Sequence, residues 1–137
     1  MAMNAFIIEG TRSPIGSFGG MLRDVRTDDL AAHSLSSLIS KFKSLDLEQI
    51  EDIYLGCANQ AGEDNRNVAR MASLLAGIPA SVPAETINRL CASGLSSVLH
   101  AQRAINSGAG DFFIAGGVEN MTRGPYVMSK SSKAYGT

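Results

Sequence analysis

Cys91 is the side chain of this sequence best placed to do chemistry. It lies between a stretch expected to be extended, 85–90, and a stretch expected to be helical, so it falls in a strand-to-helix turn. At a helix start the first N–H groups lack helical partners and the dipole is positive, which favours a thiolate. Ala92, Ser93 and Gly94 leave room for a substrate, and an acyl group on the sulfur could point its carbonyl oxygen at free amides.

A catalytic cysteine needs more than a helix terminus. A free cysteine has a pKa of about 8.5, so only a few per cent of it is thiolate at neutral pH. A helix terminus contributes about 0.3–1 kcal/mol, less than one pKa unit. The base is usually a histidine, and the chain has His33 and His100. His100 lies about 2.5 helical turns beyond Cys91 and should face away from it. We expect surface or packing roles for both histidines.

Other interpretations of these residues stay open at this point. Cys91 could be a small buried residue that fills a gap, as most cysteines are, and the same interpretation is stronger for Cys57. The two cysteines and two histidines are scattered singly, so the spacing predicts no metal site. The glycine-rich stretches do not follow the GxGxxG pattern, which disfavours a phosphate-binding loop.

The composition is that of a folded domain without a charged partner. The chain has 137 residues, 45% hydrophobic and 18% charged, enough for one domain with a real core. Its net charge of −1 gives no reason to expect nucleic acid or an anionic membrane as partner. No apolar run approaches the roughly 18–20 residues of a membrane span, and the N-terminus does not resemble a signal peptide. We therefore expect a cytoplasmic protein whose cysteines are thiols.

Short apolar runs alternate with amphipathic stretches along the chain, which predicts an α/β fold in the order β-α-β-α-β-α-β. Strands joined through helices cannot be simple hairpins, so the sheet should be mostly parallel. The predicted strands are Ala5–Glu9, Ile53–Gly56, Glu85–Leu90 and Asp111–Ala115; the predicted helices follow Thr27 and Asn67 as N-caps and cover Ala92–Ser107, with Gly108 as stop signal.

Several segments in register resemble the thiolase family. The strongest is NRLCASG at Asn88–Gly94, which resembles the nucleophile segment of that family. The others are TRSPIGSFGG at Thr11–Gly20, DDLAA at Asp28–Ala32, GCANQAGEDNRNVAR at Gly56–Arg70 and AGGVENMTRGPY at Ala115–Tyr126. The resemblance implies a thiolase N-terminal domain over residues 1–119, one half of a duplicated fold, and the start of a loop region over 120–137, with the C-terminal domain absent.

The resemblance also implies a reaction. In the family the cysteine that matches Cys91 attacks the 3-keto carbonyl of a 3-oxoacyl-CoA, acetyl-CoA leaves, and the shortened acyl group stays on sulfur until free CoA takes it. The reverse reaction condenses two acyl-CoAs, as in acetyl-CoA acetyltransferases. The implied partners are acyl-CoA and CoA, with no bound cofactor, and the full-length protein would be a homodimer or homotetramer. The Cys91 backbone N–H is a candidate oxyanion donor.

The activating histidine, a second acid/base cysteine and an asparagine-bound water come from later segments in the family, and Cys57 does not match that second cysteine. We therefore expect the isolated chain to be inactive. The sequence resembles β-ketoadipyl-CoA thiolases most, with acetoacetyl-CoA thiolases and longer-chain thiolases of β-oxidation as competitors. Two further alternatives are a β-ketoacyl synthase-like condensing enzyme and a non-catalytic folded fragment or interaction module.

Overall fold

The computed structural model describes residues 4–59, 61–62 and 64–133. The elements, in chain order, are α1 (Thr27–Ile39), η1 (Leu47–Gln49), β1 (Asp52–Gly56), α2 (Val68–Leu75), β2 (Ala84–Ile87), α3 (Ser93–Ser107) and β3 (Phe113–Gly117). None of the helices in this part of the chain is long and apolar enough to cross a membrane.

The three strands form one parallel sheet in the order β2-β1-β3, which confirms the predicted α/β class. Gly56 at the end of β1 is in register with Ile87 on β2 and with Gly117 on β3. The carboxyl ends of all three strands therefore meet at one edge of the sheet. Ligands of open α/β sheets bind outside this edge.

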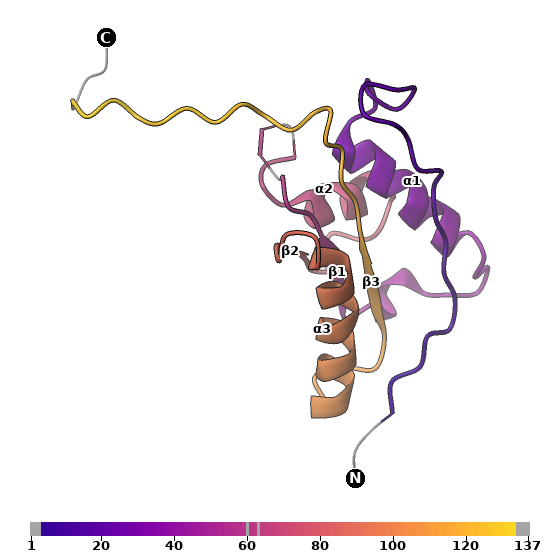
Figure 1. Cartoon of the computed structure of the whole chain (residues 1–137). Coiled ribbons are helices and arrows are strands. Elements are labelled where there is room, and N and C mark those ends of the chain that lie inside the picture. The colour runs from indigo at the N-terminus through magenta and orange to yellow at the C-terminus, as the bar shows by residue number, and fades with distance from the viewer. Residues whose placement is uncertain (1–3, 60, 63, 134–137) are drawn as a thin grey trace.

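The apolar core lies on one face of the sheet, where α1 and α2 pack together (Figure 1). Successive strand residues point to opposite faces, and Ile53 and Leu55 of β1 point to this one. The other buried members of the core come from both helices, from the connections that follow η1 and α2, and from β3: Ala31, Ala32, Leu35, Ile50, Ala69, Ala72, Ile78, Val82 and Ile114.

The opposite face is covered by α3, which packs through small polar side chains. Its buried residues are Ser93, Ser96 and Ser97, whereas Leu95 is 66% exposed. The Ser97 hydroxyl lies 2.6 Å from the carbonyl oxygens of both Gly94 and Gly116, which links α3 to β3. Serine side chains therefore let α3 lie close to the sheet.

The predicted strand at Ala5–Glu9 is wrong. The segment forms no strand, and Phe6, Ile7 and Ile8 are 79%, 86% and 71% exposed. Figure 1 shows it passing alongside β3 without joining the sheet. A cavity of about 370 Å³ separates it from β3 and α3, and its lining includes Phe6, Ile7, Ile8 and Phe113. An apolar run becomes a strand only when a partner strand lies within about 4.8 Å.

The predicted helix boundaries are mostly confirmed. Asn67 caps α2 by accepting from the Arg70 N–H at 3.1 Å, and Gly108 ends α3 in the left-handed conformation at φ 75°. The prediction of Thr27 as N-cap is wrong: Arg26 occupies that position without a side-chain cap, and Thr27 is the first helical residue. The Arg26 guanidinium instead pairs with the buried Asp28 carboxylate at 2.7 Å.

Candidate active site

Cys91 lies at the carboxyl edge of the sheet, in the turn between β2 and α3, and its side chain is exposed. The helix α3 begins at Ser93, one residue later than predicted, so only the N-cap Ala92 lies between Cys91 and α3. An exposed thiol on a short strand-to-helix turn can be reached by a substrate. The competing interpretation of Cys91 as a buried gap filler therefore does not fit the structure.

Ser93 fixes the shape of this turn. Its hydroxyl accepts from the Arg89 N–H at 2.7 Å and donates to the Leu90 carbonyl at 2.6 Å. The N–H groups of Ala92 and Ser93 donate to the carbonyls of Arg89 and Leu90, both at 3.1 Å. These two amides of the turn already have partners, so they are not the free amides that an oxyanion would need.

Leu90, directly before Cys91, has a left-handed backbone. Its φ is 52°, a conformation that costs about 1–2 kcal/mol for a residue with a Cβ. The Leu90 N–H donates to the Asn88 side-chain oxygen at 3.0 Å, and its carbonyl accepts from Ser93. These hydrogen bonds hold Leu90 in the strained conformation, in the turn that carries the exposed Cys91.

Two glycines let the first turn of α3 contact the strand ends. A Cβ on Gly56 would lie 2.3 Å from the Ser93 carbonyl carbon and 2.4 Å from the Gly94 nitrogen. A Cβ on Gly117 would lie 3.0 Å from the Gly56 oxygen and 3.3 Å from the Gly94 Cα. The Cys91 turn is therefore seated directly on the carboxyl ends of β1 and β3, with no side chain between.

The loop that follows β1 contacts the same turn. The Asn88 side-chain N–H donates to the Ala58 carbonyl at 3.0 Å. On its other side this loop is bound by Glu119, whose carboxylate accepts from the N–H groups of Ala58 at 2.8 Å and Asn59 at 3.2 Å. The segments that follow β1, β2 and β3 are thus connected by hydrogen bonds at the edge that carries Cys91.

Cys57 is a different kind of thiol. It is 1% exposed, and burial, reinforced by the negative charges of Glu119 and Asp64, raises the pKa of Cys57 to about 12. Its thiol lies 3.7 Å from a Glu119 carboxylate oxygen, to which it donates. A buried thiol of this pKa is protonated at neutral pH, which makes Cys57 a packing residue rather than a nucleophile.

Neither histidine is placed to serve Cys91. His33 is exposed on α1, a helix on the opposite face of the sheet from α3. His100 packs edge-on against the ring of Tyr54 in β1, with ring centroids 6.0 Å apart. Tyr54 also stacks on Phe113 of β3 at 5.8 Å, so His100 belongs to an aromatic cluster on the sheet. The structure supports packing and surface roles for the two histidines.

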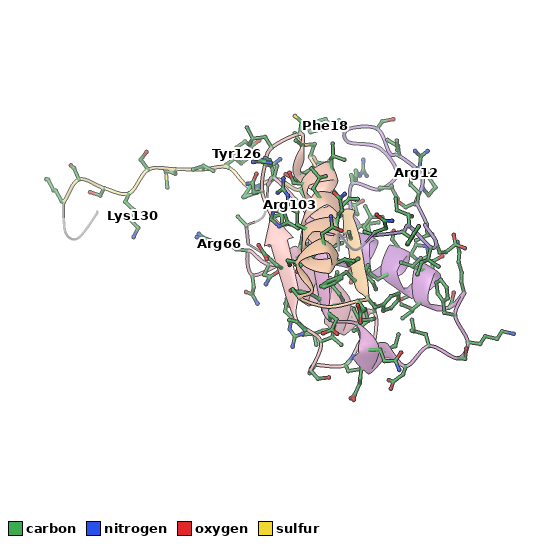
Figure 2. All side chains as sticks on the ribbon, turned by 90° about the horizontal axis from the view of Figure 1, so that it is seen from below. Arg12, Phe18, Arg66, Arg103, Tyr126 and Lys130 are labelled. Atoms are coloured by element: carbon green, nitrogen blue, oxygen red, sulfur yellow. The ribbon has the colours of Figure 1, made fainter. Side chains whose placement is uncertain are left out.

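In the part of the chain that the structure describes, the larger cavities are not lined by Cys91. A cavity of about 520 Å³ lies between the opening loop and the segment after β3; its lining includes Arg12, Phe18 and Asn120 but not Cys91. Figure 2 shows Arg12 and Phe18 on this loop, and Lys130 on the C-terminal segment that leaves the domain. Within residues 4–59, 61–62 and 64–133, no three His, Cys, Asp or Glu side chains lie together as a metal site would need.

Sequence reasoning did not single out Glu119, Gly56 or Ser93 as site residues. Ser93 carried a weak signal, because a serine near a helix N-terminus often bonds the turn that precedes it. Gly56 carried another, since a glycine at a strand end often marks the close approach of another backbone. Glu119 carried none: its partners lie about sixty positions earlier in the chain.

Comparisons with known proteins place this chain in a family. Residues 5–136 match the family described as thiolase, N-terminal domain. The chain is 60% identical to the 3-oxoadipyl-CoA/3-oxo-5,6-dehydrosuberyl-CoA thiolase of Escherichia coli K12, covering 96% of this chain and 33% of that protein. It is 57% identical to the beta-ketoadipyl-CoA thiolase of Pseudomonas knackmussii, covering 99% of this chain and 34% of that protein.

A solved structure indicates the same family. The crystal structure of the Bacillus anthracis acetyl-CoA acetyltransferase matches with a TM-score of 0.85 at 33% identity, over 99% of this chain and 35% of that one. The chain therefore belongs to the thiolase family and carries its N-terminal domain. It spans about a third of the length of the curated relatives it matches. The family match favours a thiolase over a β-ketoacyl synthase.

Proposed function

We propose that this chain supplies the nucleophile of a thiolase, an acyl-CoA acyltransferase that cleaves or forms 3-oxoacyl-CoA, and that Cys91 is that nucleophile. The observation that carries the proposal is the exposed Cys91 thiol on a hydrogen-bonded turn at the carboxyl edge of a parallel sheet. The relatives named above are thiolases, and those with the highest identity are named for 3-oxoadipyl-CoA.

The proposed reaction has two steps. The Cys91 sulfur attacks the 3-keto carbonyl, the bond between C2 and C3 breaks, and the leaving enolate of acetyl-CoA takes up a proton. The remaining acyl group stays on Cys91 as a thioester until the thiol of free CoA attacks it and releases a shortened acyl-CoA. One difficult step is thereby divided into two easier ones. With 3-oxoadipyl-CoA the group left on sulfur is succinyl; with acetoacetyl-CoA it is acetyl.

The rest of the active site lies outside this chain in our proposal. His33 is exposed on α1, on the far face of the sheet, and His100 packs on Tyr54; the pKa of Cys57 is too high for an acid/base partner. We propose that the base that activates Cys91 belongs to a later segment, that the Cys91 N–H donates to the oxyanion, and that the isolated chain is inactive. Residues 1–119 form the N-terminal domain and 120–137 begin the loop region, in a cytoplasmic homodimer or homotetramer with acyl-CoA and CoA as its only small-molecule partners.

Intact-mass spectrometry tests the proposal. The full-length gene product is incubated with 3-oxoadipyl-CoA, with acetoacetyl-CoA in parallel, and Cys91→Ala serves as control. We expect a succinyl adduct with the first substrate that is lost in the variant. An adduct that survives Cys91→Ala, or no adduct with either substrate, contradicts the assignment of Cys91. A strong acetyl adduct with only a trace of succinyl would favour the acetoacetyl-CoA alternative.

A further inference from the structure

Glu119 is an exposed residue two positions after β3, yet both oxygens of its carboxylate accept hydrogen bonds. One oxygen, Oε2, accepts from the Ala58 N–H at 2.8 Å. The other, Oε1, accepts from the Asn59 N–H at 3.2 Å and from the Cys57 thiol at 3.7 Å. Both oxygens therefore bind the loop that follows β1. A carboxylate is suited to this position because both of its oxygens accept and neither donates.

The loop that Glu119 binds is the loop that supports the Cys91 turn. The N–H of Ala58 donates to Glu119, and the carbonyl of Ala58 accepts from the Asn88 side chain at 3.0 Å. The same Asn88 amide presents its oxygen to the Leu90 N–H, also at 3.0 Å. A continuous series of hydrogen bonds thus runs from Glu119 to the residue directly before Cys91.

We propose that Glu119 is a positioning residue for the thiolase nucleophile: through Ala58 and Asn88 it holds Leu90 in its left-handed conformation and so fixes the place of Cys91. Leu90 needs such support, because its conformation is strained and its own side chain is 73% exposed. Glu119 does not act on the substrate itself. The meaning of this role rests on the proposed function of Cys91.

The choice of a carboxylate at position 119 follows from the donors it faces. In Glu119→Gln one carboxylate oxygen becomes an NH₂ group, which donates and cannot accept from a backbone N–H. One of the two loop amides, Ala58 or Asn59, then loses its partner while the size of the side chain is unchanged. The loop should shift, the Ala58 carbonyl should no longer be held for Asn88, and Leu90 should gain freedom.

Amide hydrogen exchange measured by NMR on the 137-residue chain tests this series. We expect Glu119→Gln to speed exchange of the Leu90 amide about fivefold or more, the effect of losing one supporting hydrogen bond. The amide of Leu55 in the core of β1 should be unaffected, because a local link rather than global stability is lost. Glu48→Gln, the same change at an exposed position of η1, is the matched control and should leave both amides unchanged.

A second variant separates a connected series from two independent effects. Asn88→Ala should speed exchange at Leu90 by itself, and adding Glu119→Gln to it should have no further effect on that amide. Additive effects of the two substitutions, equal acceleration at Leu55, or an unchanged Leu90 amide would each overturn the proposal. If Glu119→Gln does not fold, a Leu90 amide that is unchanged in Asn88→Ala overturns it as well. The measurement uses no acyl-CoA, so failure of acylation at Cys91 refutes the proposed function without affecting this result.

Discussion

Replacing Gly56 by alanine tests how closely the nucleophile turn must lie on the sheet. The new Cβ would lie 2.3 Å from the Ser93 carbonyl carbon, which is 1.1 Å inside the 3.4 Å at which ordinary contact begins. It would also lie 2.4 Å from the Gly94 nitrogen. Both contacts are to backbone, so no side chain can rotate away. Either the first turn of α3 or the end of β1 must move by about 1 Å, a displacement that in an enzyme can cost about 10²-fold in rate.

Overpacking of this kind should lower the free energy of unfolding by about 1–3 kcal/mol. We expect Gly56→Ala to lie toward the upper end, because both partners are backbone atoms of regular elements. The chain has no tryptophan, so far-UV circular dichroism in a urea titration is the suitable measurement. A lower midpoint with an unchanged slope would report a loss of stability with the native compactness retained.

Gly94→Ala is the matched control, since it is the same chemical change in the other partner of the contact. A Cβ on Gly94 meets no atom within 4 Å, and the position is inside α3. Alanine should therefore be neutral there or stabilising by up to about 1 kcal/mol. If Gly56→Ala unfolds at the wild-type urea concentration, or if Gly94→Ala is destabilised equally, the argument from close backbone approach is refuted.

Two predictions concern the cysteines. Burial raises the pKa of Cys57 to about 12 in the folded chain, so between the ordinary cysteine value of about 8.5 and pH 12 the unfolded state loses a proton that the native state keeps. Stability should fall as pH rises through this window, with Cys57 contributing about 1.4 kcal/mol per pH unit. Cys57→Ala should flatten that fall in urea titrations from pH 8 to 11, and an unchanged slope would contradict it. At neutral pH iodoacetamide should alkylate the exposed Cys91 at least about tenfold faster than Cys57; peptide mapping that shows equal labelling would count against Cys91 as the accessible nucleophile.

Much of the fold was predictable because it depends on local signals. The predicted ends of β1, β2 and β3 lie within two residues of the observed ends, except the end of β2, which was predicted three residues too late. The cap at Asn67 and the stop at Gly108 were predicted correctly. These features follow from apolar periodicity and from capping preferences that act over a few residues. The position of Cys91 in a strand-to-helix turn was predicted in the same way.

Features that need a distant partner were not predictable. Ala5–Glu9 has the composition of a strand but lies across a cavity from β3. In α3 the apolar Leu95 is exposed, whereas the buried residues that pack on the sheet are serines. In both cases the sequence shows which residues are apolar, but the position of the sheet decides whether those residues pair or become buried.

The sequence by itself determined the α/β class, the order of the helices and strands after residue 26, and the turn that carries the nucleophile, because each rests on residues that are neighbours in the chain. Only the tertiary structure decided that Gly56 must lack a side chain and that Glu119 supports the Cys91 turn through Ala58 and Asn88. The physical reason is that such contacts join segments about thirty to sixty positions apart, which become neighbours only when the carboxyl ends of three parallel strands meet at one edge.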